Sequence, residues 1–254
     1  NIIIDYYFGA DTDIKDGSYI RKLDLNNAFA TTEFETDEAR YRREYFVSRD
    51  ADVAVIHLDA DKSKMISVDI ELERQERVEY RTEDKAIVMF GQLKDGSNGD
   101  EGMKYLSKLT VDNEGGIVDF NNNKIIVRDA DKLTLIFSSS TNYKNENYLA
   151  FVDSLMNDAK SHSYKYLKRK HIDSYQELFN RVELDLGEGI TDNHSIDDRL
   201  YAFQEEDDPQ LATLYFHYGR YLFISSTREN LLPPNLQGLW ANTIQTPWNG
   251  DYHL

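Results

Sequence analysis

The sequence predicts a mixed fold in which an antiparallel β-sandwich comes first and helices follow. Up to about Asn142, short apolar and β-branched runs alternate with turn clusters such as Glu114-Gly115-Gly116 and Asn121-Asn122-Asn123. Many short strands joined by regular turns are typical of an antiparallel sandwich. After Asn142 the apolar residues recur with helical spacing, so the class of secondary structure changes there.

Seven runs are predicted to be strands, and most are rich in β-branched or aromatic residues. The clearest is Ile66–Leu72, where four apolar residues alternate with Ser67, Asp69 and Glu71. Because successive strand side chains point to opposite faces, this run predicts a buried stripe and a solvent-exposed face that includes Asp69. The predicted strands are Ile2–Ile4, Tyr45–Val47, Val53–Ile56, Ile66–Leu72, Ala86–Phe90, Ile125–Val127 and Leu133–Phe137.

Four helices are predicted after the strands. The first follows an apolar stripe from Tyr148 to Ala159. The second has an apolar stripe from Leu167 to Val182, and the helix is expected to end near Gly187. A short helix at 196–203 has Ser195 as its cap, and a longer one starts at Pro209 with Asp208 as its cap. The packing face expected for this last helix is Leu211, Leu214, Tyr215, Tyr218, Leu222 and Ser225.

Composition excludes several classes of partner. The 29 basic and 46 acidic residues give a formal charge of −17, which disfavours nucleic acid and anionic membrane surfaces. No apolar run approaches the ~20 residues that cross a bilayer, so membrane insertion is not predicted. There is no cysteine, which excludes disulfides and thiolate metal sites. Neither a cofactor nor a metal site is predicted.

Both ends of the sequence have the character of internal positions. The first residue is Asn1 rather than Met, no signal-peptide pattern follows it, and an apolar strand begins at once. We therefore expect the chain to be a piece of a longer protein.

The segment Asn235–Leu254 differs in character from the rest of the chain. It contains both tryptophans, Trp240 and Trp248, together with several amides and His253. Indole rings offer flat apolar faces to sugar C–H groups, and amides and imidazole bind hydroxyls. Composition alone leaves two readings open, a structural loop with buried tryptophans or a ligand site.

An ordered set of motifs resembles glycoside hydrolase family 95, the family of inverting α-L-fucosidases and some α-L-galactosidases. The most specific is Asn235-Leu236-Gln237-Gly238-Leu239-Trp240, and the full set covers most of the chain in the family's order. The other motifs are Pro247-Trp248-Asn249, Asp251-Tyr252-His253, Tyr218–Leu222, Ser225–Arg228, Arg199-Leu200, Asp207-Asp208-Pro209, Tyr19–Ala30 and Tyr41–Phe46.

The resemblance implies a β-sandwich over residues 1–142, a helical linker over 143–190 and the truncated start of an (α/α)6 catalytic barrel over 191–254. It implies hydrolysis of terminal α-L-fucosyl or related L-sugar linkages in a glycan or oligosaccharide. It also favours a bacterial protein that is periplasmic or secreted, although the sequence itself assigns no compartment.

The resemblance also locates the chemistry. An inverting glycosidase needs a general acid and a base that activates water. In this family the acid is a glutamate and the base is a pair of asparagines, and both are expected beyond Leu254. Within the chain, His253 corresponds to a substrate-contacting position, while Trp240 and Trp248 are expected to shape the wall of the substrate site. No catalytic role is carried onto Asp251, which is expected to be a turn residue.

Other interpretations remain open. A disaccharide phosphorylase of similar layout would need a phosphate site, and no Gly-rich or Arg-rich cradle for one is visible; a non-catalytic carbohydrate-binding or assembly module is the third possibility. Two acidic loops, Asp11-Thr12-Asp13 and Asp95–Asp100, lack the full EF-hand spacing for calcium. Asn193-His194-Ser195 fits the N-glycosylation pattern, but such short matches are common by chance. Oligomeric state is not predicted.

Overall fold

The computed structural model describes residues 1–9, 12–94, 101–189, 194–229, 231–237, 239–240, 242–244, 246, 248 and 250. The chain forms two compact units. The first is Asn1–Asp24 with Phe29–Ser174, and the second is Leu25–Ala28 with Tyr175–Leu254. The three domain ranges expected from the sequence remain a prediction. No helix among the described residues is long and apolar enough to cross a membrane.

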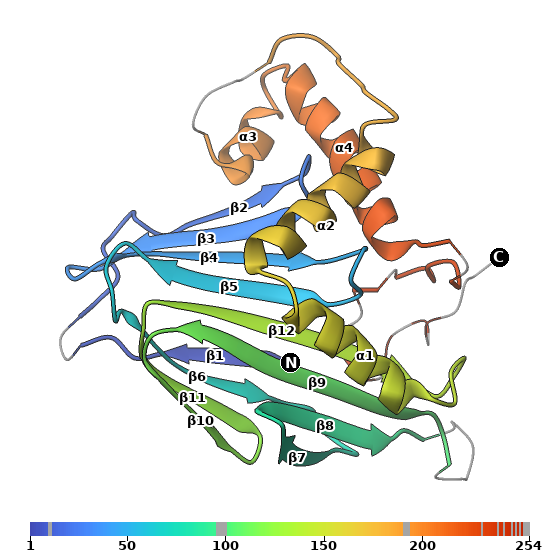
Figure 1. Cartoon of the computed structure of the whole chain (residues 1–254). Coiled ribbons are helices and arrows are strands. Elements are labelled where there is room, and N and C mark those ends of the chain that lie inside the picture. Colours follow the sequence, from blue (N-terminus) through green and yellow to red (C-terminus); the bar gives the residue numbers. More distant parts are fainter. Residues whose placement is uncertain are drawn as a thin grey trace. The chain divides into compact units, whose positions relative to one another are not determined.

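The first unit is built on two antiparallel sheets, as the sequence predicted (Figure 1). The smaller sheet has the order β1-β6-β11-β10, with strands Ile2–Tyr6, Ile66–Leu72, Lys124–Ala130 and Ile117–Asn121. The larger sheet has the order β2-β3-β4-β5-β12-β9-β8-β7. Its strands are Ile20–Asp24, Phe29–Glu35, Arg40–Val47, Ala54–Ala60, Lys132–Thr141, Lys104–Glu114, Ala86–Gln92 and Glu79–Glu83.

The main hydrophobic core combines residues of both sheets. The four apolar residues of β6 are at most 1% exposed, so the predicted alternating stripe of this strand is confirmed. They join Leu58 of β5, Leu109 of β9 and Leu133 of β12 in one cluster. Interdigitation of two inner sheet faces is how a β-sandwich buries its apolar surface.

A second cluster covers the other face of the large sheet. Helix α1, Tyr148–Lys160, lies along β9 and β12 (Figure 1). It buries Val152, Met156 and Ala159, and this i, i+4, i+7 stripe packs with Val55 and Ile136 of the sheet. The predicted first helix is therefore confirmed, and the central strands of the large sheet bury apolar residues on both faces.

Asp69 corrects one prediction from the alternating pattern. It does point away from the sandwich core, but its side chain is only 8% exposed instead of facing solvent freely. Arg128 and Lys124 of the neighbouring strand β11 form ion pairs with it at 2.8 and 3.3 Å, and the Tyr7 hydroxyl donates to it at 3.0 Å. Burial by itself would raise its pKa, but these partners outweigh burial and hold the pKa of Asp69 below its usual range.

Helix α2, Tyr164–Phe179, is shorter than the sequence suggested. It ends at Phe179 and not near Gly187. The reason is a side chain from helix α4: the Arg220 guanidinium donates to the carbonyl oxygens of Phe179 at 2.7 Å and Val182 at 2.9 Å. Because a cation near a helix C-terminus satisfies its free carbonyls, Arg220 fixes where α2 stops.

Helices α3, Ile196–Ala202, and α4, Pro209–Ser226, begin at the predicted residues. Ser195 caps α3 in a reciprocal capping box with Asp198. Asp208 accepts the Leu211 N–H at 3.0 Å at the start of α4.

A buried ion pair joins α3 to α4. Arg199 of α3 donates to both carboxylate oxygens of Asp208 at 2.9 and 3.0 Å, with side-chain exposures of 13% and 0%. A side chain at Gly189 would overlap Asp208 Oδ1, so the segment before α3 can approach the start of α4 only through a glycine. Both carboxylate oxygens of Asp208 thus accept hydrogen bonds that hold α3 against the start of α4.

We predict that His57 makes the stability of the first unit depend on pH. His57 is buried on β5, with Nδ1 2.9 Å from Thr134 Oγ1 and its ring stacked 3.8 Å from that of Tyr164. Burial lowers the pKa of His57. In the unfolded chain the His57 imidazole has a pKa of about 6.5, so it binds a proton more readily there than in the folded chain. The folded state therefore has its full stability above about pH 6.5 and loses part of it as the pH falls through that value.

The test is the free energy of unfolding by urea between about pH 7 and pH 5. His57→Gln should remove up to about 1.4 kcal/mol per pH unit from the slope against pH. An unchanged slope in His57→Gln would contradict the assignment.

We predict that Asp208→Ala destabilises α3 and α4. The substitution removes a helix cap and leaves the buried Arg199 without its carboxylate, at a cost of about 3 kcal/mol. Amide hydrogen exchange of the α3 and α4 backbone should accelerate accordingly. The neighbouring Asp207, which is exposed, is the control, and Asp207→Ala should change exchange by less than about 0.5 kcal/mol. Equal exchange in the two variants would show that the pair is dispensable.

Candidate functional site

The predicted site segment after α4 presents apolar side chains to solvent. Thr227 has an extended backbone, with φ −119° and ψ 146°, and ends the helix. In the segment that follows, the large apolar side chains between 46% and 70% exposed are Leu231, Leu232, Leu236, Leu239, Trp240, Ile244 and Trp248. Clustered exposed apolar residues mark binding surfaces or interfaces more often than free surface.

One local contact folds this segment back on itself. The Asn235 side-chain oxygen accepts the Gln237 N–H at 3.0 Å, and the Asn235 amide nitrogen lies 3.2 Å from where a Cβ of Gly250 would be. Gly250 has φ +74°, a conformation that favours glycine. The Asn235 side chain therefore lies close to Gly250, a position near the other end of the segment.

Two of the three predicted substrate-contacting residues can be located. Trp240 is 51% exposed and Trp248 is 46% exposed, so neither is a buried core residue. Half-exposed indole rings leave a face free for stacking against a ligand. His253 and Asp251 lie outside the described residues. The roles predicted for Trp240, Trp248 and His253 remain predictions.

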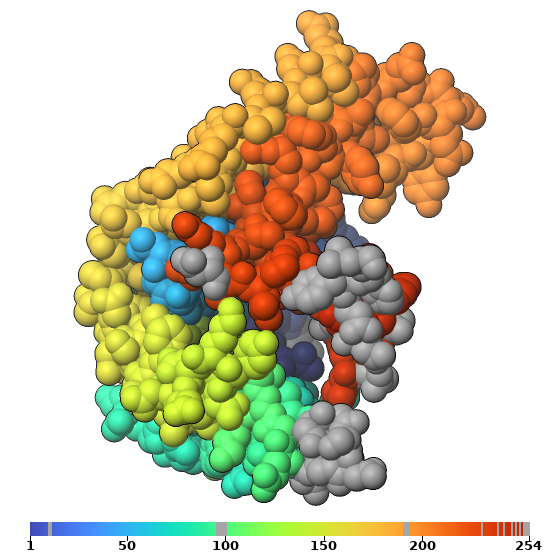
Figure 2. Space-filling view, turned by 90° about the vertical axis from the view of Figure 1, so that its right-hand side faces the viewer, coloured from blue at the N-terminus to red at the C-terminus, as the bar shows by residue number. Residues whose placement is uncertain are grey.

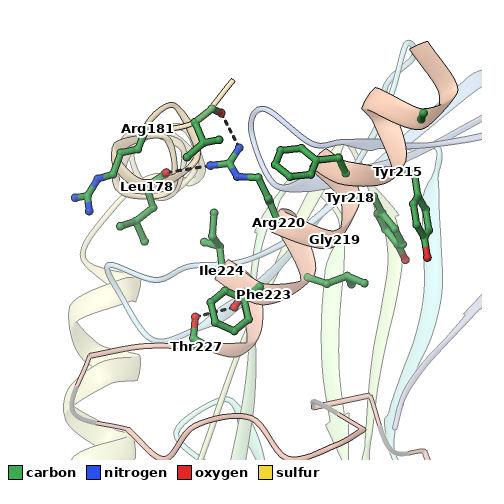
Figure 3. A pocket seen from close by; sticks show the side chains of 13 residues that line it. Leu178, Arg181, Tyr215, Tyr218, Gly219, Arg220, Phe223, Ile224 and Thr227 are labelled. Carbon is green, nitrogen blue, oxygen red and sulfur yellow. Dashed lines mark hydrogen bonds between the residues drawn. The ribbon is translucent and has the colours of Figure 1, made fainter. Parts of the chain in front are cut away.

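A groove on helix α4 was not predicted (Figure 3). It has a volume of about 960 Å³ and is mainly apolar, with Leu178 and Val182 on one side and Leu222 and Phe223 of α4 on the other. No carboxylate is among its lining residues. The groove therefore cannot supply the acid and base pair of a glycosidase, and it is suited to apolar packing or stacking.

Helix α4 buries only part of the face that the sequence predicted, because Leu211 of that face is buried whereas its two tyrosines are not. Tyr215 and Tyr218 are 79% and 41% exposed, and their side chains project from the same side of α4 (Figure 3). Tyr221 and Ile224 pack instead against Tyr175 and Phe179. The surface position of the α4 side chains is visible in orange-red in Figure 2.

The sequence held a signal that could have identified this arrangement. Between Leu211 and Ile224, apolar or aromatic residues lie on every side of α4, so no single packing face can be selected by periodicity. A helix that is hydrophobic all round is typical of a buried position with neighbours on several sides. The face that packs against α2 carries Tyr221 and Ile224, next to the Arg220 hydrogen bonds to the end of that helix.

The described residues contain no metal-ligating cluster. No group of three or more His, Asp or Glu side chains in the described ranges could hold a metal ion. The acidic loop at 95–100 and part of the one at 11–13 lie outside those ranges, as does Asn193 of the glycosylation pattern.

Two family models match the chain. Residues 1–146 match glycosyl hydrolase family 65, N-terminal domain, and residues 163–254 match glycosyl hydrolase family 95 catalytic domain. The first match covers the two sheets, and the second covers α2, α3, α4 and the aromatic segment. The sequence resemblance to family 95 is confirmed in this second part.

Three curated relatives carry related names. Alpha-L-fucosidase 2 of Arabidopsis thaliana is 31% identical over 93% of this chain and 32% of its own length. Probable alpha-fucosidase A of Aspergillus niger is 34% identical over 100% of this chain and 33% of its own length. Probable alpha-fucosidase A of Aspergillus oryzae is 30% identical over 94% of this chain and 36% of its own length. The chain spans about a third of the length of these relatives. They come from a plant and two fungi, so a bacterial origin stays a prediction.

Among solved structures, a "Putative kojibiose phosphorylase from human microbiome" matches 70% of this chain and 27% of its own, with 13% identity and a TM-score of 0.48. This similarity is too weak to support an inference about fold or chemistry. The family model that matches more than half of the chain shows its family: through residues 1–146 the chain belongs to the glycosyl hydrolase family 65 N-terminal domains, and residues 163–254 are similar to the glycosyl hydrolase family 95 catalytic domain.

Proposed function

We propose that this chain is the N-terminal part of an inverting exo-glycosidase that removes terminal α-L-fucosyl or related L-sugar units from glycans. The observation that carries the proposal is the agreement between the family 95 match at 163–254 and three relatives named as α-fucosidases, each aligned to at least 93% of the chain. The activity belongs to the longer protein, since the chain spans about a third of these relatives.

The catalytic residues are proposed to lie beyond Leu254. An inverting enzyme places its two catalytic groups roughly 6.5–9.5 Å apart on opposite sides of the glycosidic bond. In the second unit, the carboxylate of Asp208 is already held by Arg199 and the α4 backbone, and the groove on α4 has no carboxylate. None of these groups is free to act as acid or base.

The domain ranges 1–142, 143–190 and 191–254 belong to the same proposal, with α3 and α4 as the first helices of an (α/α)6 barrel. The all-round apolar character of α4 supports this, because each barrel helix packs against neighbours on both sides. In such a barrel the aromatic segment after α4 would be a loop at the substrate site, with Trp240 and Trp248 in its wall and His253 on a sugar hydroxyl.

Activity on aryl glycosides tests the proposed function. The longer gene product should hydrolyse 4-nitrophenyl α-L-fucoside or α-L-galactoside and not the D-sugar analogues, and NMR should show the β-anomer as the first product. The 254-residue chain should be inactive on all of them. Turnover by this chain would refute the proposed place of the catalytic residues.

The same assay separates the alternatives. A disaccharide phosphorylase would need inorganic phosphate and release a sugar phosphate, whereas a hydrolase works without phosphate. A non-catalytic carbohydrate-binding module would turn over none of the substrates in either form of the protein.

We predict that the aromatic segment contributes to substrate binding in the longer protein. Trp248→Ala and His253→Ala should each lower kcat/KM by about tenfold, the effect of losing one stacking or hydrogen-bonding contact. Tyr143→Ala is the control, because Tyr143 is 66% exposed on the loop after β12. If all three variants keep wild-type kcat/KM, the segment is only structural.

A further inference from the structure

We infer that the first unit carries a second carbohydrate site, a hollow beside α1 that binds one neutral sugar ring. The α1 hollow is lined by Glu83, Asp84, Ala86, Lys108, Thr110, Asp153, Met156, Asn157 and Lys160, and its volume is about 300 Å³. Small-molecule pockets start at roughly this size, so it holds a single ring and not an oligosaccharide. The choice of a sugar as the ligand rests on the proposed function, in which the longer protein acts on glycans.

The position of the hollow follows from the fold. One wall of the hollow is the β7–β8 hairpin, where Glu83 pairs with Ala86 across a two-residue turn. Both turn residues, Asp84 and Lys85, have positive φ (47° and 59°), which is the geometry of a tight hairpin turn. The Thr110 hydroxyl of β9 donates to the Lys85 carbonyl at 3.0 Å and fixes this turn against the next strands. The other wall is the edge of α1.

An ion-paired lysine lies between the two walls. The Lys108 side chain is only 12% exposed, and its Nζ donates to Asp153 Oδ1 at 2.8 Å and to Glu83 Oε1 at 3.4 Å. Burial by itself would lower its pKa, but the two carboxylates outweigh burial and raise the pKa of Lys108. It therefore stays charged and holds both carboxylates in fixed positions.

The charges of the lining select the class of ligand. Three carboxylates face two ammonium groups, so an anion such as phosphate or a sugar acid is disfavoured. Carboxylates, an amide and ammonium groups together supply many donors and acceptors in a small space, which matches the hydroxyls of a neutral sugar. Ala86 and Met156, the apolar residues of the lining, are only 1% and 2% exposed, so the lining that a ligand can reach is mainly polar.

The test is an NMR titration of the 254-residue chain with L-fucose, D-galactose and D-glucose, with glycerol and inorganic phosphate as separate arms. At least one sugar should give saturable amide shifts at Thr110, Asp153 and Asn157, with a Kd of about 1 mM, as expected for a single ring. Asn157→Ala should weaken binding about tenfold without disturbing the Lys108 ion pairs. Asp153→Ala should weaken it at least as much.

Asp158→Ala, on the next residue of the same helix, is the matched control and should leave binding unchanged. The inference is overturned if no sugar saturates, if glycerol produces the same shifts, or if phosphate binds more tightly than the sugars. These outcomes are separate from the proposed function, since fucoside hydrolysis by the longer protein is measured independently.

Discussion

Burial of both faces of the central strands of the large sheet is the constraint on which the first unit depends. One face packs on the small sheet and the other on α1, so strands such as β5 bury Leu58 on one side and Val55 on the other. A sheet covered on only one side would show a polar outer face. The hollow lies where α1 meets the β7–β8 hairpin and β9 at the border of this covered face.

The second unit is held together differently. Its described buried apolar side chains are few, namely Ala28, Tyr175, Phe179 and Leu211. Two polar ties do most of the positioning: Asp208 with Arg199 at the start of α4, and Arg220 at the end of α2. Arg199 neutralises the fully buried carboxylate of Asp208, and an unpaired charge would be costly there. Arg220 donates to carbonyl oxygens at the end of α2. The aromatic rings that α4 and the following segment leave exposed are then free for other contacts.

The division of chemistry follows from these two modes of packing. Near α4, the charged side chains of Arg199, Asp208 and Arg220 are used for structure. The exposed side chains of α4 and of the segment after it include the aromatic residues Tyr215, Phe223 and Trp240. Such a surface supplies stacking and shape but no proton transfer. In the first unit the reverse holds at the α1 hollow, where fixed charges surround a small space and aromatic rings are absent from the lining.

The sequence by itself determined the order of sheets and helices, the stripe of β6, the caps Ser195 and Asp208, and the family of the aromatic segment, because these depend on local periodicity, capping chemistry and specific motifs. Only the tertiary structure decided which face of α4 packs, where α2 ends, and that Asp69 is covered. These three outcomes depend on Arg220, Tyr221 and Arg128, whose partners are distant in sequence and leave no local pattern. Periodicity reports that a side chain is apolar, whereas its neighbours decide whether it is buried.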